Sequence, residues 1–377
     1  MAFVNIKGTG NKMTFDIKEL DISIVNSLRR IIIAEIPTVA LSFDPLSDNN
    51  PDITINVNTT ALHNEFLAHR LSLLPIKFDK DVLDAFDPHE YIFKLKVKNT
   101  GNNTINVTSK DIEIFNSNDV KYPEAFHEKV FPKDPFTKNY ILINKLRPNI
   151  YNPEKGEEID IVFKASKNIG KVHSRWSAVS CCALSNIIDD EKAEAALQLL
   201  LSNLEGQKGA PLNDNEIETH TKRFKSLDIY RHFRTNKYGE ASEFHFKIES
   251  ECGLKPTEIF QQAFNILIAK LEDFSTHVND LRITKIHDNQ HFYEIIIQDE
   301  DYTLLNVLQC MIYNQEVRNN NQTNLEYIGY YQPHPLDSKM ILKLKFKDNE
   351  EVDKFLQSKV KSLIESLNVY KSAWIKK

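Results

Sequence analysis

The sequence predicts an α+β protein in which two copies of one strand–helix unit pair within the chain as an intramolecular pseudo-dimer. The motif D-x-[ST]-[IL]-[VL]-N-x-L occurs twice, as DISIVNSL at Asp21–Leu28 and as DYTLLNVL at Asp301–Leu308. An alternating strand pattern precedes each copy, at Phe15–Ile17 and at Ile295–Ile297. Such an internal repeat is typical of two partners that bury one shared face. A third observation, a long β-rich stretch, predicts an insert domain in the first unit.

The first unit begins with two short strands within residues 2–20, around Gly8 and Gly10. A helix is predicted over Asp21–Pro37, capped by Asp21 or Ser23 and ended by the proline. Apolar side chains recur at spacings of three and four, so they share one face of this helix. Those expected at the pseudo-dimer interface are Ile24, Leu28, Ile31 and Ile32 here, and Leu304, Leu308, Met311 and Ile312 in the second copy.

Short β patterns and turns dominate the middle of the chain. Strands are expected at Thr38–Phe43 and Ile53–Val57, and a short helix at His63–Ile76 that ends at Pro75. From Lys77 to Lys167 short strand patterns alternate with turns and a proline-rich stretch. This region is predicted to be an all-β or mixed insert.

Helical patterns return after the insert. Helices are predicted at Asp189–Leu204, followed by a polar loop around Gly206 and Gly209, and at Glu258–Phe274, with a strand at Phe244–Ile248 between them.

The second unit begins near His277. Its strand is expected at Phe292–Ile297, its motif helix from Thr303, and a mobile loop at Asn319–Asn324. Two strands, Tyr327–Tyr331 and Met340–Phe346, and a helix at Glu350–Tyr370 complete it. The predicted domains are residues 1–43 with 168–275, the insert at residues 44–167, and residues 276–377.

Composition limits the classes of function. The net charge of −6 weakly opposes direct binding to a nucleic-acid backbone, which calls for a basic face, and it leaves a local basic patch open. The four cysteines have no C-x-x-C spacing, so neither a zinc ribbon nor a disulfide framework is indicated. The chain shows no signal peptide and no run long enough to span a membrane, which predicts a soluble intracellular protein.

Candidate catalytic and metal-binding groups were weighed against structural roles. His63 and His69 are six residues apart, so on a helix they point to different faces and do not form a chelating pair with Glu65. Cys181 and Cys182 lack a nucleophile elbow, and buried structural thiols are expected there. No catalytic residues and no metal ligands are therefore predicted. The adjacent Arg29–Arg30 pair has two open readings, a solvated pair or guanidinium groups presented to a partner.

Long stretches of the sequence resemble one protein family. VNSLRRIIIAEIPTVAL and NTTALHNEFLAHRLSLLPI are similar to the third-largest subunit of eukaryotic RNA polymerase II and its archaeal D counterpart. LRPNIYNPEKGEEIDIVFKASKNIGKVHSRWSAVS and FHFKIESECGLKPTEIFQQAFNILIAKL resemble the same subunit. EDYTLLNVLQ and YIGYYQPHPLDSKMILKLKF resemble the eleventh subunit, archaeal L. Parts of the insert and residues 185–240 lie outside the resemblance.

The resemblance implies a fused alpha-like polymerase subunit, as in some large DNA viruses. Such a chain is a non-catalytic platform, within a nucleotidyltransferase complex, on which the two largest subunits and small zinc-binding subunits assemble for DNA-templated transcription. No direct DNA contact, membrane contact or homodimer is implied. The residues expected to bind partners are Asn26, Arg29, Arg30, Glu35, Thr38, Asn58, Thr59, His63, Glu65, His69, Arg70, Lys171, His173 and Trp176.

One departure from the family concerns metal. The cysteines that bind zinc in the third subunit would fall between Asp79 and Lys94, where this chain has none. No cofactor is therefore expected on this chain, and magnesium and zinc are expected on other polymerase subunits. The implied location is the host cytoplasm, in a viral factory, or the virion if the chain is viral, and otherwise the nucleus. The alternative function is an independent dimerisation-fold scaffold, or a transcription regulator that binds DNA or protein.

Overall fold

The computed structural model describes residues 2–44, 50, 52–278, 282–287, 290–318 and 323–375. The chain divides into two compact units. Unit 1 comprises Met1–Ile31, Cys182–Ile248 and Phe260–Lys377, and unit 2 comprises Ile32–Cys181 and Glu249–Ile259. Unit 1 thus contains both copies of the repeated motif, and unit 2 contains the insert with its flanking segments. The domain boundaries expected from the sequence stay a prediction.

The first sheet of unit 1 has four strands in the order β1-β2-β12-β11. They are β1 (Phe3–Thr9), β2 (Lys12–Lys18), β12 (Glu243–Ser250) and β11 (Val179–Asn186). The predicted strands within residues 2–20 and at Phe244–Ile248 are confirmed. β11 was not predicted, and it corrects the expectation for two cysteines. Cys181 and Cys182 are half-buried rather than buried, because β11 is an edge strand.

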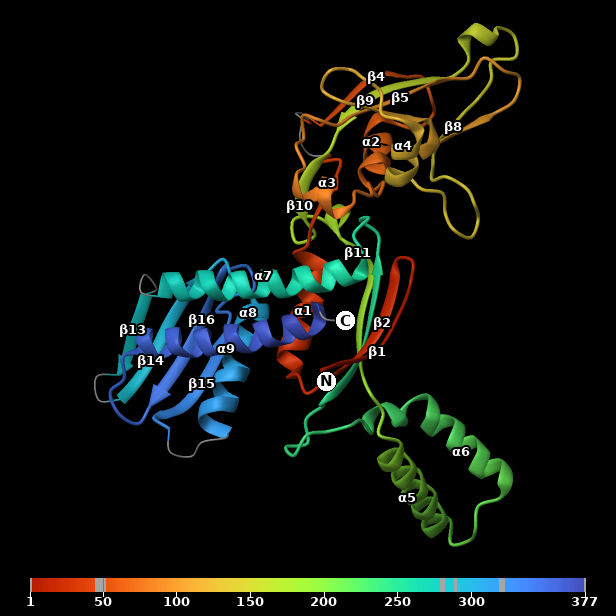
Figure 1. Ribbon diagram of the computed structural model, residues 1–377. Coiled ribbons are helices and arrows are strands. Elements are labelled where there is room, and N and C mark those ends of the chain that lie inside the picture. Colours follow the sequence, from red (N-terminus) through yellow and green to blue (C-terminus); the bar gives the residue numbers. More distant parts are fainter. Residues whose placement is uncertain are drawn as a thin grey trace. The chain divides into compact units, whose positions relative to one another are not determined.

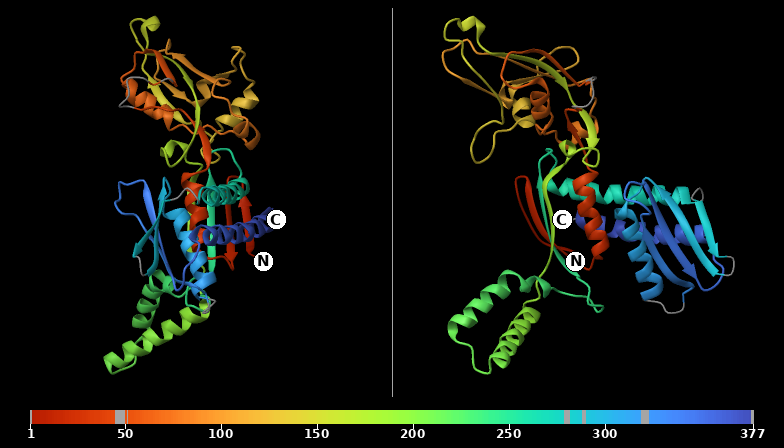
Figure 2. Two further views of the ribbon diagram at one scale, coloured as in Figure 1. Left: turned by 90° about the vertical axis from the view of Figure 1, so that its left-hand side faces the viewer. Right: turned by 180° about the vertical axis from the view of Figure 1, so that it is seen from behind.

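The second sheet of unit 1 is antiparallel, in the order β13-β14-β16-β15. Its strands are β13 (Arg282–His287), β14 (Gln290–Gln298), β16 (Lys339–Phe346) and β15 (Leu325–Tyr331). The helices α7 (Pro256–His277) and α9 (Val352–Ile375) lie side by side across one face of this sheet (Figures 1 and 2). These elements confirm the predicted strands and long helices. Of the expected mobile loop at Asn319–Asn324, residues 319–322 lie outside the described residues.

The two motif helices are α1 (Ile22–Ala34) and α8 (Tyr302–Ile312). Both predicted helices are therefore confirmed to within a few residues at their ends. α8 continues directly into a turn of π-helix at Tyr313–Arg318. From this turn Arg318 binds Glu240 through two hydrogen bonds, of 2.7 Å from Nη1 and 2.6 Å from Nη2. The pair joins the second motif helix to the loop before β12, and the guanidinium holds the pKa of Glu240 below its usual range.

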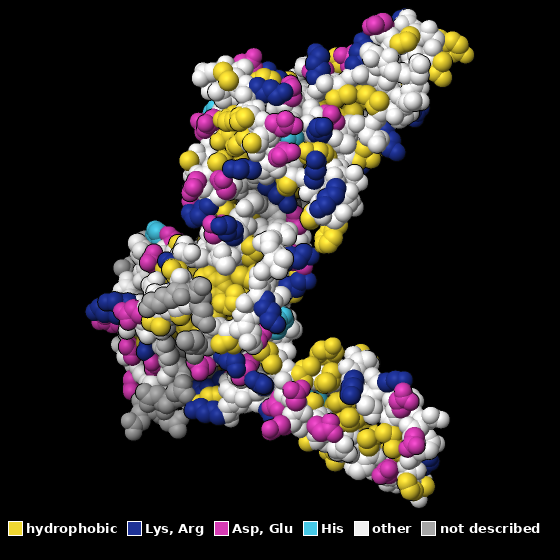
Figure 3. Space-filling view, turned by 45° about the vertical axis from the view of Figure 1, so that its right-hand side comes forward, with side chains coloured by type: hydrophobic (Ala, Val, Ile, Leu, Met, Phe, Trp, Pro, Cys, Tyr) yellow, Lys and Arg dark blue, Asp and Glu magenta, His cyan; other side chains and the backbone are white. Residues whose placement is uncertain are grey.

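A helical hairpin connects β11 to β12. It consists of α5 (Asp190–Lys208) and α6 (Asp214–Ser226), with a 3₁₀ turn at Asp228–Arg231. The hairpin has its own small core around Ala193, Leu197 and Phe224, and other hydrophobic side chains lie on its surface (Figure 3). The polar loop expected around Gly206 and Gly209 begins only at Gly209, because α5 continues to Lys208. Gly209 then ends the helix at φ +69°, a conformation that suits glycine.

Unit 2 contains a four-stranded sheet in the order β4-β9-β5-β7 and two two-stranded sheets, β6-β8 and β3-β10. The expected mixed insert is therefore confirmed, with helices that the sequence did not predict at α3 and α4. The strands are β3 (Pro37–Ala40), β4 (Ile53–Asn58), β5 (Ile92–Lys98), β6 (Ile105–Thr108), β7 (Ile112–Phe115), β8 (Leu142–Leu146), β9 (Glu158–Lys164) and β10 (Ser166–Ile169). The helices are α2 (Asn64–Ser72), α3 (Lys80–Asp84) and α4 (Glu124–Val130), with 3₁₀ turns at Ser109–Asp111, Pro153–Lys155 and Ser174–Trp176.

The core of unit 1 is aromatic. Phe3 and Phe15 of the first sheet, Phe260 of α7 and Trp374 of α9 lie within ring-centroid distances of 4.6 to 6.3 Å. Aromatic rings in such edge-on and tilted pairs contribute stability beyond the area they bury. The last helix of the chain therefore packs into the core beneath the first strands.

Candidate assembly surface

The two copies of the repeated motif begin with aspartates in matching roles. Oδ1 of Asp21 accepts a hydrogen bond from the backbone N–H of Ser23 at 2.8 Å, and Oδ1 of Asp301 accepts one from Thr303 at 2.7 Å. Each carboxylate thus caps its helix by accepting from an N–H group two residues later. The spacing of the D-x-[ST] motif therefore has the same local explanation in both copies, because the aspartate caps the helix that follows it.

The second oxygen of each aspartate lies beside the other copy. Oδ2 of Asp21 accepts a hydrogen bond from the Asn314 amide at 3.0 Å, just beyond α8. Oδ2 of Asp301 forms an ion pair with Nη2 of Arg30, on α1, at 3.7 Å. Asp301 therefore contacts the opposite motif helix, and Asp21 contacts the turn that continues the other one. Such reciprocal contacts are those of a two-fold interface, here formed between two halves of one chain.

Two further bonds join the helices. Oγ of Ser27 donates to the carbonyl of Thr303 at 2.9 Å, and Nε of Arg30 donates to the Thr303 hydroxyl at 2.9 Å. Ser27 and Thr303 are buried, so these bonds satisfy groups that water does not reach. Of the residues expected at the pseudo-dimer interface, Met311 is half-buried. The other seven, Ile24, Leu28, Ile31, Ile32, Leu304, Leu308 and Ile312, are at most 2% exposed.

The adjacent arginines have different surroundings. Arg30 uses its guanidinium on Asp301 and Thr303, whereas Nε of Arg29 donates to the side chain of Asn26 at 3.0 Å. Arg29 therefore has no bond to α8 among the contacts of the described residues. The two interpretations left open for this pair therefore apply differently to each arginine. Arg30 helps to hold the contact between α1 and α8, which we call the seam, and Arg29 does not.

In unit 2, several expected partner-binding residues meet around the 3₁₀ turn at Ser174–Trp176. Oγ1 of Thr38 donates to the Trp176 carbonyl at 2.6 Å, and the backbone N–H of Lys171 donates to the carbonyl of Ala34 at 2.7 Å. Nδ1 of His173 accepts from the backbone N–H and from Nε of Arg175, each at 3.1 Å. Burial, with the positive charges of Arg175 and His69, lowers the pKa of His173. The imidazole is therefore held neutral, as an acceptor.

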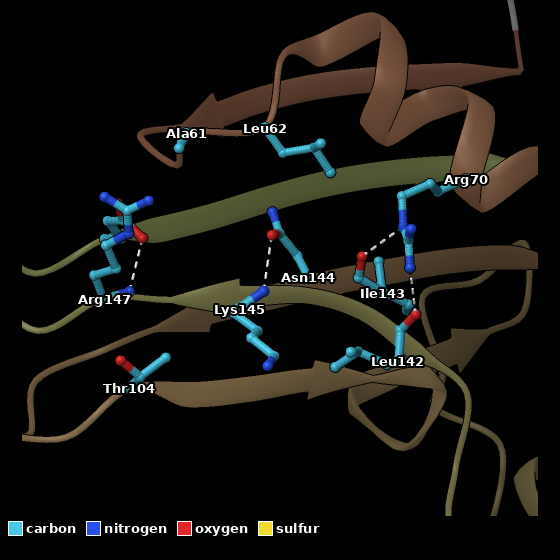
Figure 4. A pocket seen from close by; sticks show the side chains of 10 residues that line it. Ala61, Leu62, Arg70, Thr104, Leu142, Ile143, Asn144, Lys145 and Arg147 are labelled. Atoms are coloured by element: carbon cyan, nitrogen blue, oxygen red, sulfur yellow. Dashed lines mark hydrogen bonds between the residues drawn. The ribbon is translucent and has the colours of Figure 1, made fainter.

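A second group of expected residues lies just before α2 and along it. The Asn58 side chain donates to the Leu62 carbonyl at 2.8 Å, and Oγ1 of Thr59 accepts from the backbone of Glu158 at 2.8 Å. Arg70 donates to the carbonyls of Leu142 and Ile143, each at 2.9 Å (Figure 4). These three side chains brace the fold of unit 2. His63, Glu65 and His69 are exposed on the same helix or its cap, and Glu35 and Asn26 are half-exposed.

The sequence analysis missed Asn314 and Arg175. Arg175 joins its own turn to the segment after β3, because it donates to the Leu41 carbonyl at 3.1 Å. It also stacks on Trp176 of the same turn, with 5.4 Å between the guanidinium carbon and the ring centroid. Its position between two expected contact residues was a usable signal. Nothing local in the sequence marks Asn314, whose role depends on the pairing of the two halves.

Within the described ranges, no group of three or more His, Cys, Asp or Glu side chains is arranged to hold a metal ion. No helix in the described part of the chain is long and apolar enough to cross a membrane.

Comparison with known proteins identifies both halves. The model of the RNA polymerase Rpb3/Rpb11 dimerisation domain matches residues 14–271, and a second model with the same description matches residues 293–373. The DNA-directed RNA polymerases I and III subunit rpac1 of Dictyostelium discoideum is 32% identical over 310 residues, which cover 72% of this chain and 80% of that protein. The RNA polymerase II subunit RPB3 of Schizosaccharomyces pombe is 26% identical over 301 residues, covering 74% and 88%. The chain therefore belongs to the RNA polymerase Rpb3/Rpb11 dimerisation-domain family, and it carries that domain twice.

Proposed function

We propose that this chain is a non-catalytic assembly subunit of a multisubunit DNA-directed RNA polymerase. The observation that carries the proposal is the presence of two family dimerisation domains on one chain, with their motif helices joined through Ser27, Arg30 and Thr303. The two relatives described above are each named as one polymerase subunit, rpac1 and RPB3. When both halves lie on one chain, no second chain is needed to complete the seam. The covalent connection sets the effective concentration of one half around the other.

The proposed partners are the two largest polymerase subunits and small zinc-binding subunits. The contacts described above separate two groups among the residues that the sequence predicts to bind partners. Arg29, His63, Glu65 and His69 have side chains at least partly accessible and without a bracing role across the seam, so they are the first candidates for contact with a partner. Thr38, Asn58, Thr59 and Arg70 act mainly by holding the surface in shape.

Catalysis, magnesium and zinc are assigned to other subunits in this proposal, and direct DNA contact by this chain is not expected. The location follows that of the polymerase, in the nucleus or, for a viral enzyme, in a cytoplasmic viral factory or the virion. The net charge of −6 supports a protein partner over a nucleic-acid partner.

Affinity purification of the tagged chain from its native source tests the proposal. We expect it to recover two very large subunits together with template-dependent RNA synthesis. Recovery of the chain alone, or as a homodimer, contradicts the proposal. Salt-sensitive DNA binding by the isolated chain, without large partners, would instead support the regulator alternative.

A matched pair of variants separates assembly from folding. Arg29→Glu should leave thermal unfolding unchanged and reduce recovery of the large subunits. Arg30→Glu places a carboxylate beside Asp301 and should lower the unfolding temperature as well. Normal assembly by the Arg29 variant would remove that residue from the proposed interface.

A further inference from the structure

Unit 2 contains a groove of about 520 Å³ between strand β8, the residues just before α2 and Arg70 in the last turn of α2. We call it the β8 groove, and the residues that matter here are Leu62, Arg70, Leu142, Lys145, Arg147 and Glu157. Figure 4 shows Arg147 towards one end of the groove, Lys145 near its middle and Arg70 at the opposite end. The sequence analysis assigned only Arg70 to a contact surface.

Side chains form hydrogen bonds with the backbone N–H and C=O groups along this side of β8. Arg70 donates to the carbonyls of Leu142 and Ile143, and the N–H of Lys145 donates to the Asn144 side chain at 2.7 Å. The N–H of Arg147 donates to the Glu157 carboxylate at 2.7 Å. A ligand in the groove therefore does not need to add a strand to β8. It would be recognised by the side chains that line the groove.

The charges in the groove favour an acidic ligand. Three cations line it against one carboxylate, that of Glu157, which is already engaged by the Arg147 backbone. The ion pairs found among the described residues do not include Arg70, Lys145 or Arg147, although most other strand lysines of unit 2, such as Lys96 and Lys98, pair with carboxylates. This positive groove lies in a chain whose net charge is −6. Complementary charge of this kind sets partner choice and association rate.

Apolar side chains lie at the Arg70 end. Leu142 is 39% exposed, and Phe66, which precedes Arg70 by four residues and so shares its helix face, is 65% exposed. Leu62 also lines the groove and is half-buried. Leu142 lines the groove, and Phe66 lies outside the lining on the helix face that carries Arg70, so exposed apolar surface is available to a partner there. One end of the groove is therefore suited to an apolar group and the rest to carboxylates.

We propose that the β8 groove binds an extended acidic segment of another polymerase subunit. In this arrangement an apolar side chain packs against Leu142 and Phe66, and carboxylates pair with Lys145 and Arg147. From Leu142 to Lys145 an extended strand advances about 10 Å, which places the first carboxylate roughly three residues from the apolar side chain. The proposal rests on the proposed function, because it takes the ligand from the assembled polymerase. A nucleic-acid strand fits less well, because Glu157 lies beside Arg147 in the lining.

The experiment compares the full-length chain alone with the purified native polymerase. The readout is the acetylation rate of single lysines, followed by mass spectrometry. Lys145 should react about tenfold more slowly in the complex, because an occupied site reacts only through its free fraction. Lys138, an exposed lysine of a turn in the same unit, serves as the control and should react equally in both samples. A zero-length carbodiimide should also join the Lys145 amine to an Asp or Glu of another subunit.

Charge reversal provides the second arm. Lys145→Glu combined with Arg147→Glu should weaken retention of the cross-linked subunit by about tenfold or more. The matched control, Lys133→Glu with Lys138→Glu, adds the same charge away from the groove and should have no effect. If the large subunits are recovered but Lys145 reacts equally in both samples, the groove proposal is overturned and the proposed function stands. If no large subunits are recovered from the native source, the proposed function fails first. Ultraviolet cross-linking of the Lys145 peptide to nucleic acid would also overturn the groove proposal.

Discussion

Trp374 of the last helix lies against Phe260 of α7, with ring centroids 4.6 Å apart and an interplanar angle of 60°. The same indole contacts Phe3 and Phe15 of the first sheet, at 5.2 and 4.9 Å. A residue close to the end of the second copy thus completes the core of the first copy. The pseudo-dimer is held at this core as well as at the seam between α1 and α8.

Replacement of Trp374 should therefore destabilise unit 1 as a whole. Trp374→Ala removes a large buried side chain and should lower the free energy of unfolding by about 3–5 kcal/mol. Urea denaturation followed by circular dichroism measures this change. Ile375→Ala is the control, because the neighbouring side chain is 55% exposed, and it should change stability by less than about 0.5 kcal/mol. Equal stability of the two variants would show that the indole does not hold the core.

Charge placed in the seam should separate the two motif helices. Leu28 and Leu308 are fully buried, so Leu28→Asp or Leu308→Asp puts a carboxylate where no partner compensates it. We expect a loss of about 3–5 kcal/mol, or failure to form a compact chain. Thermal unfolding and the hydrodynamic radius report these outcomes. Leu336→Asp, at an exposed site of the same unit, should have little effect. A compact fold with unchanged stability in both buried variants would refute the seam.

The predictable parts of this fold are those that depend on local spacing. The caps at Asp21 and Asp301 and the apolar stripes of α1 and α8 follow from residues within one or two helical turns, so the sequence was sufficient. Helix α6 was missed because it is mostly polar, yet its capping box at Asn213 and Glu216 was a readable signal. The contact of Asn314 with Asp21 could not be foreseen, because it joins residues 293 positions apart.

The residues of the candidate assembly surface were likewise predictable only in part. The resemblance supplied the residues, but it did not distinguish Arg30, which is bonded to Asp301, from Arg29, which is not. That distinction depends on side-chain direction across the seam. The β8 groove was likewise beyond the sequence, because α2 and β8 are separated by about seventy residues and meet only in the folded insert.

A comparison of Gly253 with Gly239 separates the free-energy cost of a close backbone contact from the cost of backbone strain. Gly253 has φ +91°, and a Cβ there would lie 2.5 Å from the Phe78 carbonyl oxygen. Gly239 has φ +82°, but a Cβ there would meet nothing within 4 Å. Gly239→Ala should therefore cost about 1–2 kcal/mol from backbone strain alone, and Gly253→Ala clearly more because Phe78 must also move. Chemical denaturation of both variants measures the difference. Similar losses of stability in the two variants would indicate that the backbone of Phe78 moves away at no cost in free energy.

The imidazole of His173 should titrate below the ordinary range of histidine. Burial and the charges of Arg175 and His69 lower its pKa in the folded chain, so the native state favours the neutral ring. A group with a lowered native pKa contributes stability above its unfolded pKa, near 6.5, and loses that contribution as pH falls through the native pKa. NMR titration of the full chain should give an apparent pKa for His173 below about 6.5. Acidification should therefore weaken the acceptor bonds from Arg175 to Nδ1 and loosen the turn that carries Trp176.

Substitution of Arg175 separates the effect of its charge on the pKa of His173 from the other two causes, burial and the charge of His69. Arg175→Met removes the neighbouring charge and keeps much of the burial, so the pKa of His173 should rise towards its usual value without reaching it. His173→Gln keeps an acceptor near the Arg175 N–H group but cannot titrate, so its stability should lose the fall towards acid pH that the lowered pKa of His173 predicts for the unaltered chain. If the Arg175→Met variant titrates at the same pH as the unaltered chain, burial and the charge of His69 lower the pKa of His173 without a contribution from Arg175.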